Sequence, residues 1–202
     1  VFFCGCGATG RLSLALETIW KQTHSHQKEK DQVLSFMAGG DVALIHSIEK
    51  FEDFPEFGER QLVELGFRDG DLLVATTEGG ETPFVIGATF AAAKISKRKP
   101  FFLYCNPDEV LIHQIERSKK VIEDGNIHKI NLTVGPMALS GSTRMQATTI
   151  LMYFAGLALC FHQNSMSEIQ KEVNKLLSTI STTDFRFLKD FIEKESSFYM
   201  NN

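Results

Sequence analysis

The sequence has few of the residues that build a metal centre or a disulfide framework. Its 202 residues include four cysteines, Cys4, Cys6, Cys105 and Cys160, and no C-x-x-C pair. The histidines of the segment THSHQ have no cysteine or third ligand nearby in the sequence. We therefore expect no metal site. We expect the cysteines to be reduced core residues of a cytoplasmic protein.

Long apolar runs and broad basic stretches are also missing. The longest apolar stretch, ILMYFAGLALCF, has about a dozen residues, whereas a membrane-spanning helix needs about 20. The net charge is −4 and the pI is about 5.9, and the one dense basic run, KISKRKP, suits a solvated helix end. A nucleic-acid surface needs clustered Lys and Arg. We expect neither a membrane nor a nucleic acid as partner.

Short apolar runs alternate with helix-like segments over the first two thirds of the chain. Such alternation predicts an α/β fold, with a mostly parallel five-stranded sheet covered by helices on both faces. The predicted strands are residues 1–5, 33–39, 71–77, 100–106 and 127–135. The predicted helices between them are residues 10–23, 41–50, 55–65, 82–96 and 107–123.

After residue 140 the pattern indicates helices only. We predict a long apolar helix over 142–163, then an amphipathic helix, then a last helix over 184–198. The apolar stripe of the second comprises Met166, Ile169, Val173, Leu176, Leu177 and Ile180. We expect a sheet domain over 1–163 and a helical extension over 164–202. Because Val1 already lies in a predicted strand, we expect the chain to be an excerpt of a longer protein.

The segment at residues 5–10, GCGATG, has the spacing G-x-G-x-x-G between a predicted strand and a helix. This spacing is the dinucleotide fingerprint, although a sugar phosphate can use the same helix N-terminus. A dinucleotide site usually has an acidic residue about 20 residues further on. Asp41 is about 30 residues beyond Gly10 and suits a helix cap. A nicotinamide enzyme is therefore the weakest of the interpretations, and we expect no cofactor.

Two further loops carry glycine and hydroxyl residues before a predicted helix. One is ATTEGGETP, in which Thr82 and Pro83 suit an N-cap and a first helical position. The other is GPMALSGSTRMQATT. Each loop alone is ordinary capping chemistry. Together they predict one rim, at the carboxyl ends of the strands, that holds a single phosphate through N–H and hydroxyl groups.

Five segments resemble the SIS (sugar isomerase) domain of N-acetylmuramic acid 6-phosphate etherases and glucokinase regulatory proteins. They are GCGATGRL, AGGD followed by EKFED, ETPFVIGA, CNP and VGPMALSGSTRM, in matching order over about residues 1–160. The resemblance implies a flavodoxin-like three-layer sandwich that binds a phosphosugar. It implies that the hydroxyls of Thr9, Thr77, Ser142 and Thr143 hold the phosphate. Together with the loop residues Gly7, Ala8, Gly10, Gly79 and Ser140, these are the expected phosphosugar-binding residues. It also implies that Glu52 faces the sugar.

The sequence departs from the etherase pattern at one helix. The etherases carry an acid–base glutamate nine residues beyond the last glycine of the first loop, and this chain has Ile19 there. Glu17 points about 200° away around the helix and does not replace it. The TTEGGETP loop differs from both relatives: Glu78 and Glu81 either lie near the sugar or face solvent.

Three function classes remain open. A sugar-phosphate sensor or regulatory module is favoured by Ile19 and by the C-terminal helices. A lyase of the etherase type, or a sugar-phosphate isomerase, would use Glu52 and Glu78 as base and acid. A dinucleotide-dependent oxidoreductase is the third. The expected partners are a sugar phosphate, a second copy or a second SIS half of the same chain, and a regulated enzyme.

Overall fold

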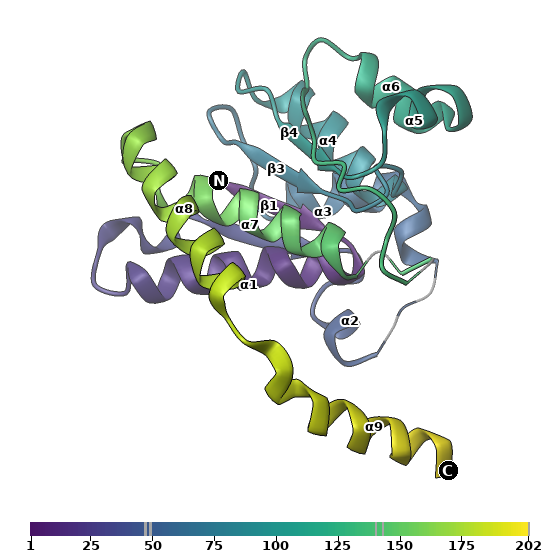
Figure 1. Cartoon of the computed structure of the whole chain (residues 1–202). Helices are drawn as coiled ribbons and strands as arrows, with labels where there is room; N and C mark the ends of the chain where they lie inside the picture. The colour runs from purple at the N-terminus through teal and green to yellow at the C-terminus, as the bar shows by residue number, and fades with distance from the viewer. Residues whose placement is uncertain (47, 49, 140, 143, 202) are drawn as a thin grey trace. The chain divides into compact units, whose positions relative to one another are not determined.

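A computed structural model describes residues 1–46, 48, 50–139, 141, 142 and 144–201. Its sheet has the strand order β2-β1-β3-β4-β5, and all four strand pairs are parallel. The five strands are β1 Phe2–Gly5, β2 Leu34–Met37, β3 Leu73–Thr76, β4 Phe101–Tyr104 and β5 His128–Asn131. The expected α/β sandwich with a parallel five-stranded sheet is confirmed (Figure 1).

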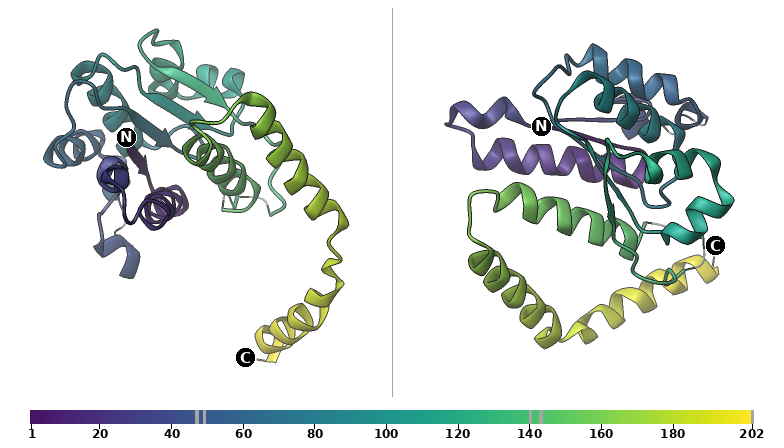
Figure 2. Two further views of the ribbon diagram at one scale, coloured as in Figure 1. Left: turned by 90° about the vertical axis from the view of Figure 1, so that its left-hand side faces the viewer. Right: turned by 90° about the horizontal axis from the view of Figure 1, so that it is seen from above.

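Two cores lie on opposite faces of the sheet because successive strand side chains point to opposite sides. Phe2 and Cys4 of β1 belong to a core with α3 Pro55–Glu64, α4 Pro83–Ile95, α5 Asp108–Gln114 and α6 Glu116–Glu123. Phe3 belongs to the other core, with α1 Gly7–Thr23 and α7 Gln146–Cys160. Figure 2 shows α1 and α7 side by side on that second face.

Several helix boundaries differ from the sequence predictions. The helix predicted from residue 10 begins at Gly7, because the extended Cys6 is the N-cap. Among the described residues of the segment 41–50, the helix is the four-residue α2 Val42–Ile45, and Asp41 takes its N-cap position without a side-chain cap bond. The segment 107–123 is split by Ile115, whose extended backbone separates α5 from α6. The segments η1 Lys28–Gln32 and η2 Phe51–Asp53 are short 3₁₀ helices.

The helix predicted over 142–163 is α7, and it covers only Gln146–Cys160. The backbone of Ser142 donates to the carbonyl of Leu139 at 3.0 Å, which closes a turn ahead of the helix. Ser142 therefore lies ahead of α7 and not at its first residue, which corrects the predicted start of this helix. Cys4 and Cys105 are buried core thiols, as expected. Cys6 is half-buried and Cys160 is exposed, which corrects the expectation that all four cysteines lie in the core.

The helices α3 and α4 approach each other closely through two glycines. A Cβ at Gly58 would lie 1.9 Å from the carbonyl oxygen of Phe84, and a Cβ at Gly87 would lie 1.9 Å from that of Pro55. Neither position has room for a side chain. This pair of helices covers the sheet beside the loop that follows β3.

Contacts divide the chain into two units, Val1–Cys160 and Phe161–Asn202. The second unit contains α8 Met166–Thr182, η3 Phe185–Leu188 and α9 Lys189–Asn201. Helix α8 begins at a capping box, in which Ser165 and Glu168 satisfy each other's backbone N–H groups. On its stripe, the exposed fractions of Met166 and Leu177 are 78% and 56%. In the part of the chain that is described, no helix is long and apolar enough to cross a membrane.

Candidate functional site

Strands β1 and β3 are parallel neighbours in the sheet, so their carboxyl ends lie side by side. The candidate site is at these two ends. The hydroxyl of Thr76 donates to the carbonyl oxygen of Cys4 at 3.0 Å and ties the two strand ends together. The loops that follow both strands therefore begin at the same edge. In parallel α/β sheets this carboxyl edge is where ligands bind.

The first loop runs directly into α1. Gly7 has a φ of 54°, and a Cβ built there would meet no atom within 4 Å, so the backbone is open on this side. Ala8, Thr9 and Gly10 lie in the first turn of the helix. The Thr9 hydroxyl accepts from the N–H of Cys6 at 2.9 Å and donates to its carbonyl at 2.8 Å. Thr9 is 1% exposed, and its hydroxyl holds the helix start.

A thiol and a carboxylate meet across this edge. The Cys6 Sγ donates a hydrogen bond to the carboxylate of Glu52, which lies in η2. Burial raises the pKa of the Cys6 thiol, and the hydrogen bond to Glu52 and the nearby Glu78 raise it further. The thiol therefore stays protonated and serves as a donor to Glu52. Through this contact the structure brings Glu52 to the first loop.

The second loop contributes Thr77, Glu78 and Gly79. Thr77 is buried, and its hydroxyl lies 3.0 Å from that of Thr82. Glu78 accepts a 3.0 Å hydrogen bond from Thr148 on α7. The pKa of the Glu78 carboxyl is raised mainly by burial, with a smaller rise from Glu52, while Thr148 and Arg144 oppose the rise. Glu78 is thus partly enclosed rather than a solvent-facing loop charge.

Glu81 is the other acidic residue of this loop, and it lies on the solvent side of the loop. Its carboxylate lies 3.7 Å from the guanidinium of Arg117, and both side chains are about half exposed. Of the two carboxylates that the sequence left open, Glu78 is the one near Glu52 and the first loop.

The third loop is described only in part. Ser142 is half-buried and lies four positions ahead of Gln146, the first residue of α7, while Ser140 and Thr143 lie outside the described residues. Sequence reasoning did not single out Cys6, Thr148 or Arg144. Cys6 lies between two of the loop glycines, and Thr148 follows the third loop by a few residues. In the sequence, only their position beside a motif could have indicated that they belong to the site.

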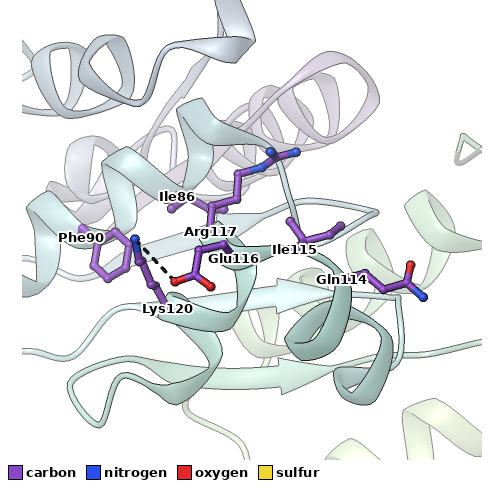
Figure 3. A pocket seen from close by; sticks show the side chains of 7 residues that line it. All are labelled: Ile86, Phe90, Gln114, Ile115, Glu116, Arg117 and Lys120. Carbon is purple, nitrogen blue, oxygen red and sulfur yellow. Dashed lines mark ion pairs between the residues drawn. The ribbon is translucent and has the colours of Figure 1, made fainter.

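A pocket of about 430 Å³ lies beside this edge, between α4 and α6 (Figure 3). Its lining is Ile86, Phe90, Gln114, Ile115, Glu116, Arg117 and Lys120. None of the sequence-predicted site residues lines it. In the described ranges, no group of three or more His, Cys, Asp or Glu side chains is arranged to hold a metal ion.

The fold is an α/β sandwich with loops gathered at the carboxyl edge of a parallel sheet, and comparisons with known proteins say what the chain is similar to. The family described as "Glucokinase regulatory protein N-terminal SIS domain" matches residues 1–93. The chain is thus similar both to the SIS domain of glucokinase regulatory proteins and to N-acetylmuramic acid 6-phosphate etherases.

Two curated relatives illustrate the match. N-acetylmuramic acid 6-phosphate etherase 1 of Bacillus licheniformis is 31% identical over 149 residues, covering 74% of this chain and 44% of the relative. The N-acetylmuramic acid 6-phosphate etherase of Rippkaea orientalis is 30% identical over 208 residues, covering 99% of this chain and 63% of the relative. The chain therefore spans about half the length of the curated relatives that it matches.

Among solved structures, phosphoheptose isomerase from Neisseria gonorrhoeae is similar over 78% of this chain and 74% of that chain. The sequence identity is 16% and the TM-score is 0.47.

Proposed function

We propose that the sheet unit binds a sugar phosphate at the carboxyl edge of β1 and β3. The observation that carries this proposal is the meeting of Glu52 with the first loop through Cys6, next to the partly enclosed Glu78. The glycine and hydroxyl loops supply N–H groups for a phosphate, and the carboxylates supply acceptors for sugar hydroxyls. The named substrate of the etherase relatives is itself a sugar phosphate.

We further propose that this domain acts as a sugar-phosphate sensor or regulatory module of carbohydrate metabolism. Support comes from α1, where Ile19 occupies the position of the etherase glutamate and is 37% exposed. Glu17 accepts a 2.6 Å hydrogen bond from Lys21 and another from Ser35 of β2. The Glu17 carboxylate is therefore held on the side of α1 and is not available as a second acid at the loop edge.

An etherase-type lyase or a sugar-phosphate isomerase is the alternative. Its supporting observation is that Glu52 and Glu78 lie close enough for each to influence the same thiol, Cys6. Elimination needs one group to remove a proton and another to protonate the leaving group. A carboxyl whose pKa is raised, such as that of Glu78, suits the acid, and Glu52 would be the base.

The partners and the location belong to the same proposal. We infer that the chain associates with a second copy or with a second SIS half, and that a sensor of this kind acts on a regulated enzyme. Free cysteines at all four positions are consistent with a reducing cytoplasm.

A thermal-shift screen tests the binding proposal. Phosphosugars, including N-acetylmuramic acid 6-phosphate, are compared with their dephosphorylated sugars and with nicotinamide dinucleotides. A ligand at 100 times its Kd adds about 2.7 kcal/mol to the free energy of unfolding, which is a readily measured shift. We expect a shift with at least one phosphosugar and none with its unphosphorylated form. A shift with the dinucleotides alone would instead support the oxidoreductase.

A further inference from the structure

Three successive carbonyl groups of the second loop are each held by a side chain from outside the loop. The amide of Asn106 donates to the carbonyl of Gly79 at 3.1 Å. The hydroxyl of Ser118 donates to the carbonyl of Gly80 at 2.8 Å. The Nε of Arg117 donates to the carbonyl of Glu81 at 2.5 Å. Asn106 follows β4, and Arg117 and Ser118 lie on α6, so the loop is anchored at three successive peptide groups.

Such anchoring fixes the direction of the loop's N–H groups. In a planar trans peptide the N–H points opposite to the preceding carbonyl. The N–H groups of Gly80, Glu81 and Thr82 therefore point away from Asn106, Ser118 and Arg117. Among the described residues, no backbone carbonyl accepts a hydrogen bond from any of the three N–H groups.

The loop is also seated by packing. Gly80 has a φ of 77°, and a Cβ there would lie 2.8 Å from the Cδ1 of Leu111 on α5. Ser118 is 0% exposed, so its hydroxyl has no water to replace the bond to Gly80. Arg117 is about half exposed and forms part of the wall of the pocket between α4 and α6 (Figure 3).

We propose that Ser118 and Arg117 of α6, with Asn106, are positioning residues that set the affinity of the second loop for a phosphate group. The inference rests on the proposed function and adds residues that lie behind the loop, away from the ligand. They act by holding the carbonyls of residues 79–81, so that the three following N–H groups are arranged before a ligand arrives. Such preorganisation lowers the entropy that binding must otherwise remove.

Phosphate titration of the whole chain, followed by NMR of the backbone amides, tests the inference. Inorganic phosphate is added to ¹⁵N-labelled protein while the amide signals of Gly80, Glu81 and Thr82 are recorded. In the wild type these signals shift and give a Kd. In Ser118→Ala and in Arg117→Ala, we expect the Kd to rise roughly fivefold, the scale of one lost hydrogen bond.

Matched controls separate positioning from stability and from charge. Ser96 is also buried, and its hydroxyl donates at 2.7 Å to the carbonyl of Asp71, ahead of β3 at the other end of the sheet. Ser96→Ala therefore removes a similar bond, and we expect the wild-type Kd. Lys120→Ala removes an exposed cation of α6 that makes no bond to the loop, so it corrects Arg117→Ala for charge. Ser118→Thr keeps the hydroxyl and is expected to restore binding.

The outcomes distinguish the two proposals. If the wild-type amides do not respond to phosphate, the proposed function fails and this inference fails with it. If the wild type binds phosphate and Ser118→Ala has the same Kd as Ser96→Ala, the inference alone is overturned. Because Arg117 lies at the surface, Arg117→Ala gives an answer even if Ser118→Ala does not fold: a Kd equal to that of Lys120→Ala also overturns it.

Discussion

Glu78 links the candidate site to the stability of the fold. Burial is the largest cause of its raised pKa, and the hydrogen bond from Thr148 only partly offsets that cause. A carboxyl with a raised pKa holds its proton more tightly in the folded state than in the unfolded state. As the pH rises above the ordinary value of 4.5, the unfolded state loses its proton first, and folding becomes less favourable.

We therefore expect Glu78→Gln to be more stable than the wild type at pH 7. The neutral amide carries no buried charge and keeps an oxygen to accept from Thr148. The difference between the two proteins should grow from about pH 4.5 upward and should vanish at lower pH. Urea unfolding at a series of pH values measures it. A pH-independent difference would contradict this explanation, and Glu109→Gln, at an exposed position, serves as the control.

Ser142 is the described residue of the third loop that most directly tests phosphate binding. If its hydroxyl donates to a phosphate, Ser142→Ala weakens phosphosugar binding by roughly 1–3 kcal/mol, as for a hydrogen bond to a charged group. Because Ser142 does not cap α7, the variant should unfold at nearly the wild-type temperature. Calorimetric titration measures the affinity. Equal affinities in the two proteins would remove Ser142 from the site.

Individual residues were predictable where a motif contained them. The glycine loops indicate Gly7 and Gly79 from sequence alone, and the resemblance implies that Glu52 faces the sugar, which stays a prediction. The contact between Cys6 and Glu52 was not predictable, because it joins positions 46 residues apart with no periodic pattern between them. The role of Thr9 was not predictable either. Its hydroxyl bonds the backbone of Cys6 at the start of α1, and this bond depends on the extended backbone of Cys6.

At the scale of elements, the contact between α3 and α4 determines how closely these helices cover the sheet. Gly58→Ala places a Cβ where the carbonyl oxygen of Phe84 would be 1.9 Å away. Alanine favours an isolated helix over glycine by about 1 kcal/mol. The clash with backbone outweighs that gain, since overpacking costs about 1–3 kcal/mol, and more where backbone must move. We expect a clearly lower free energy of unfolding in urea.

Gly156→Ala is the matched control on α7. A Cβ there would lie 3.5 Å from Leu16, which is ordinary contact, so this variant should be more stable than the wild type by about 0.5–1 kcal/mol. Opposite signs for the two substitutions are the expected result. Stabilisation by both would show that α3 and α4 are further apart than described.

The spacing of apolar residues predicted which segments form strands and which form helices, but it did not predict where the helices begin and end. All five strands form within their predicted segments. The break at Ile115 was missed because the charged and apolar spacing of 107–123 suits one continuous helix. Ile115 instead packs against the core beside α4 with an extended backbone, so tertiary packing overrode the local pattern.

At the scale of the whole molecule, the apolar stripe of α8 has no assigned role. Leu177 and Ile180 are 56% and 52% exposed, and a stripe of this kind usually marks an interface. We expect concentration-dependent association of the chain in sedimentation. The substitution Leu177→Ser should weaken it. A monomer at all concentrations would count against self-association of this chain.

The central claim is that the chain binds a sugar phosphate without catalysing ether elimination. Each acid or base group typically contributes a factor of roughly 10² to 10⁴ to such a rate, and Ile19 stands where one of the two is expected. Glu52 would then accept hydrogen bonds from sugar hydroxyls, so Glu52→Gln should weaken binding.

Calorimetric titration with N-acetylmuramic acid 6-phosphate, followed by a lactate assay of the same sample, tests the claim directly. The account predicts saturable heat of binding in the wild type, weaker binding in Glu52→Gln, and no lactate above the uncatalysed background in either. Absence of binding would contradict it, and so would rapid lactate release by the wild type that is lost in Glu52→Gln.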